Sequence, residues 1–446
     1  MSTSETSANK PGRKPWNKRR MALGALAAGA LGAALLRPRD AGAPHGSYFK
    51  LLTDALRLAG MAQPVLLIDK NRLLANQTAI RHHMTMMKQP MALRLVAKSL
   101  PCQALLDSLI LQMRTPRLMV FNLPYLQHLA ALGEKAVRPD LDILLGKPLP
   151  AAAAARFYRE MRGAFDDQRQ LQWLIDSPAR LTQYQQLAQQ QKRRLRVNLE
   201  LDVGLRRGGF ADLQALGQVL EQIRKEPLLE FSGMMGYDAH IPKLPLQSLR
   251  DDALAHAKKV YQDALQLALQ TLKPAHGGRD WTLNAAGSPT YRLHDGSGAA
   301  NEVAIGSAFV KPGDFDTPLL QELKAACYIA TPVLKAGREF AMPYGVQALG
   351  GLARAWDPNS NQAYFIYGGQ WLAEPVSPAG LSASTLYGTS SNQQMLQGSG
   401  AQGLQVDDWV FFRPRQSEAL FSQFGAIALF DTGRITDFWP VWPAQA

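Results

Sequence analysis

The sequence predicts an α/β protein built on a (β/α)8 TIM barrel and followed by a mainly-β domain. Three observations predict this fold. Short apolar runs recur between helix-like segments from residue 64 onward, no glycine-rich dinucleotide-binding turn follows the first run, and the helical pattern stops near residue 325. We therefore expect an amino-terminal segment over residues 1–45, the barrel over residues 46–325 and the mainly-β domain over residues 326–446.

The amino-terminal segment combines a basic stretch with an apolar run. The stretch NKPGRKPWNKRR precedes the sixteen apolar or small residues MALGALAAGALGAALL, and RPRDAGAPHG follows them. A charged region before an apolar region is the layout of an export signal or a membrane anchor. The excess of positive charge before the apolar run predicts that the rest of the chain lies outside the cytoplasm. We expect a periplasmic or inner-membrane-anchored protein whose first segment engages the membrane or the export machinery.

The charge of the chain does not indicate a nucleic-acid partner. Eight basic and two acidic residues lie among the first 40, so this short stretch carries +6 of the formal net charge of +13. The remaining residues contain no dense basic stripe interleaved with aromatic residues, which excludes the usual pattern of a phosphate-backbone binder. Cys102 and Cys327 both lie in apolar contexts, so we expect small buried hydrophobes rather than a disulfide framework or a metal site.

The predicted barrel strands are apolar runs that recur at intervals of roughly 25 to 50 residues. They are PVLLID (64–69), LRLVA (93–97), RLMVFN (117–122), LDILLG (141–146), LQWLID (171–176), LRVNLELD (195–202), LEFSGMMGY (229–237), WTLNAAG (281–287) and NEVAIG (301–306). Runs that are apolar on both faces and are separated by helices are typical of parallel strands. Eight or nine of them in one block favour a closed barrel over an open sheet. Barrel active sites are built at the carboxyl ends of the strands, so the residues after each run are the candidates.

Lys98 follows the second of these runs, in LRLVAKSLPC. A lysine at the end of a barrel strand directs its amine into the mouth of the barrel, where it can form a covalent bond with a carbonyl-bearing ligand. Salt bridges or simple surface exposure account for most lysines, so Lys98 needs partners to carry a function.

Four later strand ends supply possible partners. LDVGLRRGGF (201–210) brings two arginines that suit a carboxylate or another anion, and GMMGYDAHI (233–241) brings Tyr237 and His240. NAAGSPTY (284–291) and EVAIGSAF (302–309) are glycine-hydroxyl turns, which can hold a phosphate with backbone N–H groups and hydroxyls. Together these residues fit a phosphorylated cofactor that bears an aldehyde.

In this order the motifs resemble those of fold-type III pyridoxal-phosphate enzymes, the alanine-racemase-type barrels, and within them the D-threonine aldolase and D-serine dehydratase group. PVLLIDKNRLLANQ looks like the opening strand and helix of that group, and RLVAK is similar to its Arg-Pro-His-Ala-Lys signature, with Arg94 and Lys98 retained. LDVGLRRGGF resembles Asp-x-Gly-x-x-Arg-x-Gly, YDAH resembles Tyr-x-Gly-His, and AGSPT resembles Gly-Gly-Thr-Pro-Thr. NEVAIGSAF is similar to Thr-Glu-x-x-x-Gly-Ser-Tyr, so the resemblance extends from about residue 64 to the carboxyl end.

The resemblance implies a role for each matching residue. Lys98 would hold pyridoxal 5'-phosphate covalently and act as acid or base, with Arg94 near the ring oxygen or orienting the lysine. Arg207 would pair with an anionic group, and Tyr237 and His240 would line the ring or stack on it. The catalytic set would be Lys98, Tyr237, His240 and Arg207. The phosphate would be held by Gly287, Ser288, Thr290, Gly306 and Ser307.

The metal ligands of the D-threonine aldolase and D-serine dehydratase group are replaced in this sequence. In that group the β-domain supplies a divalent metal through a His-x-Cys or His-x-Asp pair, whereas the matching segment here, VDDWVFFRPRQSEALF (406–421), has Gln416 and Glu418. The last histidine of the chain is His294, so imidazole ligation is excluded in this domain. Oxygen ligands of this kind suit a hard cation such as Mg²⁺ or Mn²⁺. We expect an altered or absent metal site.

Three functions are compatible with these residues. The first is a pyridoxal-phosphate-dependent lyase of the D-threonine aldolase or D-serine dehydratase type, acting on D-β-hydroxy amino acids. The second is an amino-acid racemase or another enzyme that transfers the Cα proton, which needs only the lysine and a base on each face. The third is a non-catalytic protein that binds the cofactor or an amino acid. We expect the lyase, with a small amino-acid substrate and, by resemblance, a homodimer.

Overall fold

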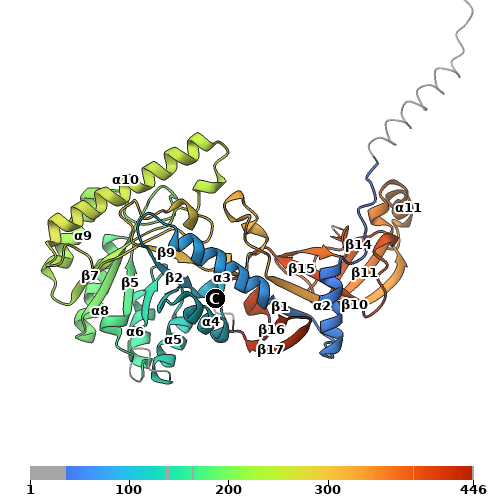
Figure 1. Ribbon diagram of the computed structural model, residues 1–446, viewed down its shortest axis with the longest axis horizontal. Helices are drawn as coiled ribbons and strands as arrows, with labels where there is room; N and C mark the ends of the chain where they lie inside the picture. The colour runs from blue at the N-terminus through green and yellow to red at the C-terminus, as the bar shows by residue number, and fades with distance from the viewer. Residues whose placement is uncertain (1–36, 136–139, 163–164, 385, 444–446) are drawn as a thin grey trace, which may run out of the picture.

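The computed structural model describes residues 37–135, 140–162, 165–384 and 386–443, and it contains two parts that lie side by side (Figure 1). A barrel of strands surrounded by helices forms one part, and a sheet-rich domain forms the other. The predicted fold class, a (β/α)8 barrel with a mainly-β domain, is confirmed. The amino-terminal basic and apolar segment lies outside the described residues. No helix in the described part of the chain is long and apolar enough to cross a membrane.

Eight parallel strands close the barrel in chain order. They are β2 (Ala92–Val96), β3 (Arg117–Val120), β4 (Asp142–Leu145), β5 (Leu171–Ile175), β6 (Leu195–Leu201), β7 (Leu229–Gly236), β8 (Thr282–Ala285) and β9 (Glu302–Ile305). The last strand closes on the first, because β9 pairs with β2 with Leu95 opposite Ile305. Since all eight strands run the same way, their carboxyl ends meet at one mouth of the barrel.

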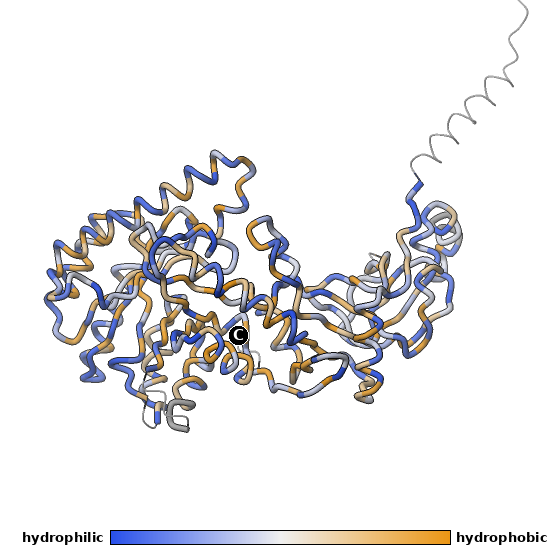
Figure 2. Tube along the Cα trace, viewed as in Figure 1, coloured by the Kyte–Doolittle hydropathy of each residue, from blue (hydrophilic) through white to orange (hydrophobic). Residues whose placement is uncertain are grey.

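The helices of this part cover the outside of the barrel (Figure 1). They are α3 (Lys70–Thr85), α4 (Gln103–Met113), α5 (Leu123–Lys135), α6 (Ala151–Glu160), α7 (Asp167–Gln170), α8 (Pro178–Gln191), α9 (Leu213–Lys225) and α10 (Gln247–Leu272). Hydrophobic and hydrophilic residues alternate along α9 and α10 (Figure 2), as expected for helices with one buried face. Side chains fix several helix starts: Ser177 accepts the N–H of Arg180 at the start of α8, and Asp212 accepts two N–H groups at the start of α9.

The second part is a nine-stranded sheet in the order β13-β14-β11-β10-β1-β16-β17, with β15 paired to β10 and β12. Its strands from the carboxyl-terminal region are β10 (Cys327–Glu339), β11 (Gln362–Tyr367), β12 (Ala373–Ser377), β13 (Ser382–Ala383), β14 (Gln393–Gly398), β15 (Trp409–Pro414), β16 (Ala426–Asp431) and β17 (Arg434–Pro440). Two helices accompany the sheet, α2 (Ser47–Leu58) and α11 (Gln347–Trp356). The side chains of α2 pack with Trp409 and Phe411 of β15 in a small apolar core.

Strand β1 (Val65–Asp69) belongs to this sheet and not to the barrel. It pairs antiparallel with β10 and parallel with β16. The expectation that PVLLID opens the barrel is therefore wrong, and Lys98 follows the first barrel strand rather than the second. All five residues of β1 are buried, so its sequence pattern is the same as that of a barrel strand.

Both cysteines are free and buried, which confirms that they are small buried hydrophobes. Burial raises the pKa of the Cys327 thiol to about 12 and also raises the pKa of Cys102. Neither thiol is therefore activated as a nucleophile at neutral pH.

Candidate active site

A pocket opens at the carboxyl-terminal mouth of the barrel and encloses about 640 Å³, part of it open to solvent. The ends of β2, β3, β4, β6, β7, β8 and β9 contribute to its walls, and a loop after β15 of the second domain closes one side. Its polar lining consists of Lys98, Ser99, Arg207, Tyr237, Asn284, Ser288, Ser307 and Glu418.

Lys98 extends into this pocket from a short 3-10 turn, Ala97–Ser99, that follows β2. Its side chain is 38% exposed. The Nζ atom lies 4.6 Å from the centroid of the Phe121 ring and 3.5 Å from Oε1 of Glu418. The amine is thus held over an aromatic ring and beside one carboxylate, but it is accessible to a ligand in the pocket.

The turn after β8 forms one wall of the pocket. Ala286 adopts a positive φ of 63°, a conformation that a non-glycine residue rarely takes and that often marks a functional turn. A Cβ atom on Gly287 would lie 2.4 Å from Cε2 of Tyr237, so only glycine lets the tyrosine ring pack against the turn. The hydroxyl oxygen of Ser288 accepts the N–H groups of Gly306 (3.0 Å) and Ala308 (3.1 Å), which ties this turn to the one after β9.

The turn after β9 completes the same wall. A Cβ atom on Gly306 would lie 2.8 Å from Cβ of Val96 and 3.0 Å from Cβ of Ser99, so this glycine lets the ends of β9 and β2 approach. In the described chain, the backbone N–H groups of Ser288 and Ser307 have no acceptor. Two adjacent unused N–H groups beside two serine hydroxyls form a site for an anion such as phosphate.

Arg207 and Tyr237 lie together on another side of the pocket. The Arg207 guanidinium is 4.9 Å from the centroid of the Tyr237 ring, and the arginine is exposed. Burial raises the pKa of the Tyr237 phenol, the positive charge of Arg207 lowers it, and Asp238 and Glu418 raise it further. The net effect is a raised pKa, so Tyr237 is a neutral hydrogen-bonding group at neutral pH.

The structure brings together Lys98, Arg207, Tyr237, Gly287, Ser288, Gly306 and Ser307 from the predicted site. It places Thr290 and His240 outside the lining of the pocket. Thr290 is fully buried, where its hydroxyl donates to Asp238 (2.5 Å) and accepts the N–H of Gly287. His240 begins a 3-10 turn after β7, and its Nδ1 atom is buried without a partner. Thr290 therefore supports the turn at Gly287 from behind instead of lining the pocket.

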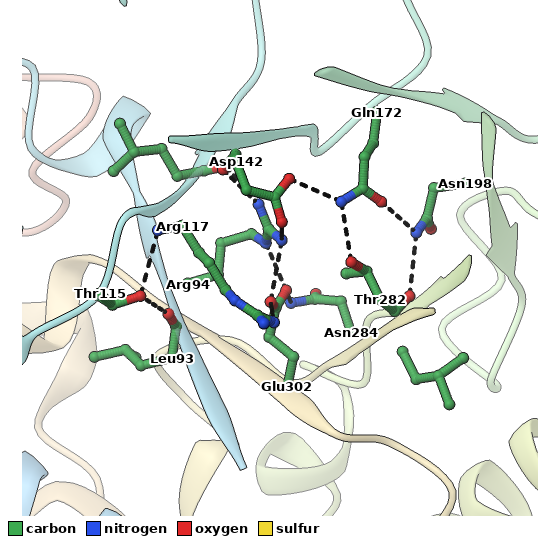
Figure 3. A network of polar contacts seen from close by, with 12 residues as sticks. Leu93, Arg94, Thr115, Arg117, Asp142, Gln172, Asn198, Thr282, Asn284 and Glu302 are labelled. Carbon is green, nitrogen blue, oxygen red and sulfur yellow. Dashed lines mark hydrogen bonds and ion pairs between the residues drawn. The ribbon is translucent and has the colours of Figure 1, made fainter. Parts of the chain in front are cut away.

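Arg94 also lies outside the pocket, in the interior of the barrel (Figure 3). It is 0% exposed, and all its N–H groups have acceptors: the Glu302 carboxylate, the Asp142 carboxylate and carbonyl, and the Leu118 carbonyl. The distance from Arg94 Nε to Glu302 Oε1 is 2.5 Å. Burial acts to lower the pKa of Arg94, but Asp142 and Glu302 outweigh it and raise the pKa. Arg94 is thus a core residue, and in this structure it contacts neither Lys98 nor the pocket.

The two residues that replace the metal pair have separate partners. The Gln416 side chain donates an N–H to Asp314 (3.1 Å), whereas Glu418 lies in the pocket with Lys98, Ser99 and Ser307. Within the described ranges, no group of three or more His, Cys, Asp or Glu side chains is arranged to hold a metal ion. The expectation of an altered or absent metal site remains a prediction.

Several pocket residues were not singled out by the sequence. Phe121 lies under the Lys98 amine, and Asn284 links the pocket to the barrel interior by donating an N–H to Glu302 (2.8 Å). Ser99 and Ser417 bind Glu418 and Ser307 respectively. Ser99 lies in LRLVAKSLPC and Asn284 in NAAGSPTY, so their position at strand ends could have identified both as pocket residues. Ser417 could not be found in this way, because its contact depends on how the two domains dock.

Comparisons with known proteins give a family for the barrel and a set of solved structures with the same fold. The family model described as alanine racemase, N-terminal domain, matches residues 68–312, which is more than half of the chain. The match begins in β1 and ends just after the turn that follows β9, so it covers all eight barrel strands and the turns that follow them. A search of the curated proteins finds no match.

Solved structures with this fold include enzymes of three kinds. D-threonine aldolase from Filomicrobium marinum superposes with a TM-score of 0.64 at 14% identity, over 90% of this chain and 98% of the other. D-threo-3-hydroxyaspartate dehydratase from Delftia sp. HT23 gives 0.63 at 15% identity, over 91% and 100%. Alanine racemase from Bacillus anthracis gives 0.60 at 13% identity, over 85% and 98%. At these identities the likeness shows the shared fold of both parts.

Proposed function

The chain belongs to the alanine racemase N-terminal domain family of fold-type III pyridoxal-phosphate enzymes, and on this basis we propose that it is a pyridoxal-phosphate-dependent enzyme acting on amino acids. One observation carries the proposal. An accessible lysine amine lies in the same barrel-mouth pocket as two linked glycine-hydroxyl turns whose N–H groups at Ser288 and Ser307 are unused. A cofactor with an aldehyde at one end and a phosphate at the other matches this pair of features.

The residues present fit this cofactor. Lys98 would hold it covalently, and the N–H groups of Ser288 and Ser307 with the Ser288 hydroxyl would hold its phosphate. Gly287 and Gly306 leave room for the close approach of Tyr237 and of Ser99 that a side chain would prevent. Tyr237 offers an aromatic face to a planar ring. When bound, pyridoxal phosphate withdraws electrons from the bonds at Cα of an amino acid, which makes each of them easier to break.

The remaining groups suit the handling of an amino-acid substrate. Arg207 is exposed at the pocket and has a planar guanidinium that can bind a carboxylate with two hydrogen bonds. The Lys98 amine can accept or donate a proton at Cα once it is released from the cofactor. Tyr237, with its raised pKa, can hold a proton on the phenol and donate a hydrogen bond to the substrate.

Within this class we propose a lyase of the D-threonine aldolase or D-serine dehydratase type, acting on D-β-hydroxy amino acids. Two observations support the lyase. The structural likeness to the aldolase and the dehydratase extends over about nine tenths of this chain, and a carboxylate of the second domain, Glu418, reaches the pocket next to Lys98. A racemase is the alternative, since Tyr237 also lines the pocket and could serve as a second proton-transfer group. A non-catalytic binding protein is the third candidate.

The lyase proposal is tested on the purified protein with D-threonine, D-serine and D-alanine, with and without EDTA. We expect a visible absorbance band from the bound cofactor and, with a β-hydroxy substrate, either glycine plus acetaldehyde or an oxoacid plus ammonia. Lys98→Ala should abolish the band, while Lys259→Ala, a matched change of an exposed lysine on α10, should retain it. A colourless wild-type protein would exclude both enzymes, and conversion of D-alanine to its enantiomer without cleavage of any substrate would favour the racemase.

We also propose that the chain forms a homodimer and that residues 1–45 act as an export signal or membrane anchor, with the barrel outside the cytoplasm. The proposal of a dimer rests on the resemblance. The proposal of export rests on the sixteen-residue apolar run that follows a basic stretch. Light scattering of the purified chain tests the first, with twice the monomer mass expected. Fractionation of cells that express the chain tests the second, and barrel recovered only with cytoplasmic proteins would contradict it.

A further inference from the structure

Glu418 is the acidic residue that lines the pocket in the described part of the chain, and it comes from the second domain rather than from the barrel. It lies four residues beyond the end of β15, next to Ser417. Its side chain is 32% exposed, so it faces the open part of the pocket and is accessible to a ligand.

Its carboxylate is held at three points. Oε1 lies 3.5 Å from Nζ of Lys98, and Oε2 accepts hydrogen bonds from the hydroxyls of Ser99 (3.4 Å) and Ser307 (3.3 Å). Ser99 follows β2 and Ser307 follows β9, so the carboxylate bridges the seam at which the barrel closes. Ser417 fixes the loop from the other side through a 3.1 Å contact with the Ser307 hydroxyl.

This arrangement does not suit a divalent cation. The Gln416 amide donates to Asp314, and the Glu418 carboxylate already accepts two hydroxyl protons beside the positive charge of Lys98. A cation at Glu418 would meet the lysine ammonium at close range, which is repulsive, and no second carboxylate lines the pocket within the described chain. Of the two residues at the metal-ligand positions of the D-threonine aldolase and D-serine dehydratase group, Glu418 therefore pairs with Lys98 and Gln416 binds Asp314.

We propose that Glu418 is a catalytic base that removes the proton of the substrate's β-hydroxyl group, so that the chain cleaves D-β-hydroxy amino acids without a divalent metal. This inference rests on the proposed function. With the cofactor bound, the substrate's amino nitrogen would lie near the place of the Lys98 amine, and the β-hydroxyl oxygen is three bonds from that nitrogen. A carboxylate 3.5 Å from the lysine nitrogen is therefore within reach of the hydroxyl.

The step balances without a co-reactant other than the bound cofactor. The proton of the β-hydroxyl moves to the Glu418 carboxylate, the electrons of the O–H bond form a C=O bond, and the Cα–Cβ bond breaks. The electron pair of that bond would remain at Cα, where pyridoxal phosphate would supply the electron withdrawal, and the Lys98 amine would donate the proton that gives glycine. The other product is an aldehyde. Dehydration would instead require a proton to be given to the leaving hydroxyl, and a carboxylate in an ion pair has none to give.

The test compares Glu418→Gln with Glu374→Gln, a matched change of an exposed glutamate on β12. Aldehyde release from D-threonine should fall by roughly 100-fold or more in Glu418→Gln, the usual contribution of a positioned base. The visible band should persist in Glu418→Gln, and the exchange of the D-alanine Cα proton with D₂O, which involves no β-hydroxyl, should fall far less than aldehyde release does. Glu374→Gln should match the wild type in all three measurements. Glu418→Asp should recover part of the lost cleavage.

A readout without turnover tests the metal half of the inference. Calorimetric titration of the cofactor-free protein with MnCl₂ and ZnCl₂ should show no one-to-one binding, and EDTA should leave cleavage unchanged. The inference is overturned by cleavage that EDTA removes and Mn²⁺ restores, by Glu418→Gln cleaving as fast as the wild type, or by a wild type that releases no aldehyde. It is overturned as well if Glu418→Gln loses the visible band together with proton exchange. Absence of the band from the wild type itself would refute the proposed function instead.

Discussion

Two ion pairs lie at opposite ends of the same short segment of chain, and they differ in almost every property. Arg94 of β2 pairs with Glu302 inside the barrel, where both side chains are 0% exposed and the closest N–O distance is 2.5 Å. Lys98, just past the end of β2, pairs with Glu418 at the mouth, where the side chains are 38% and 32% exposed and the distance is 3.5 Å. The first pair has no unused donor on the arginine, whereas the second leaves the amine accessible.

The difference separates a structural pair from a reactive one. Removing one partner of a buried pair leaves an uncompensated charge in the interior, which costs about 3–5 kcal/mol. A half-exposed pair contributes at most about 1 kcal/mol, so it can open when a ligand arrives. Side-chain charge alone therefore does not identify a catalytic cation in this segment. Depth in the barrel and the number of satisfied donors distinguish the two.

The largest expected effect is on stability, from Arg94→Met. Glu302 and Asp142 would lose their buried counter-charge, so the free energy of unfolding should fall by about 3–5 kcal/mol. Urea unfolding followed by circular dichroism measures this. Arg117→Met is the matched control, since its side chain is 37% exposed and it binds only one Glu302 oxygen. Equal stability of the two variants would contradict the conclusion that the buried Arg94–Glu302 pair is structural.

Arg207→Gln should act on substrate binding and not on stability. Hydrogen bonds to charged groups contribute about 1.5–3 kcal/mol, so KM for an amino acid should rise roughly tenfold to hundredfold. Unfolding free energy should stay within about 0.5 kcal/mol because the side chain is exposed. Arg206→Gln, a change in the neighbouring exposed arginine that pairs with Asp202, should leave KM unchanged. A KM that responds equally to both changes would mean that Arg207 has no specific carboxylate contact.

Gly287→Ala should have the smallest effect of the three and should be confined to the mouth. The new Cβ atom would overlap Cε2 of Tyr237 at 2.4 Å, and overpacking of this kind costs about 1–3 kcal/mol. Displacement of the tyrosine should also weaken binding of pyridoxal phosphate to the cofactor-free protein, which the rise of the visible band during titration measures. Gly298→Ala has open space around the new atom and is the control. Cofactor affinity that is unaffected by Gly287→Ala would remove Tyr237 from the cofactor site.

Much of this architecture follows from local sequence patterns. Doubly apolar runs separated by helices predicted the barrel, and the residues at the strand ends predicted Lys98, Arg207 and the two serine turns, because all parallel strands end at one mouth. The assignment of Val65–Asp69 to the barrel failed since a fully buried strand has the same pattern in either sheet.

The features that could not be predicted from the sequence are contacts between residues far apart in the chain. Arg94 and Lys98 stand in one motif, but their partners are distant in the sequence. Glu302 lies 208 residues from Arg94, and Glu418, the partner of Lys98, lies in the other domain. Thr290 was likewise misplaced in the predicted site, because its hydroxyl donates a hydrogen bond to Asp238, 52 residues away. Glu418 was recognised only as a replaced metal position, because its contact with the barrel mouth exists only when the second domain docks.

Covalent attachment of the cofactor at Lys98 is the central claim, and reduction of the loaded protein with borohydride followed by peptide mapping tests it most directly. Borohydride makes the bond between pyridoxal phosphate and an amine permanent, so the modified residue can be identified by mass. We predict a phosphopyridoxyl group on the peptide that contains Lys98, and none on that peptide in Lys98→Ala. A label on a different lysine, or a protein that takes up no pyridoxal phosphate, would contradict the account.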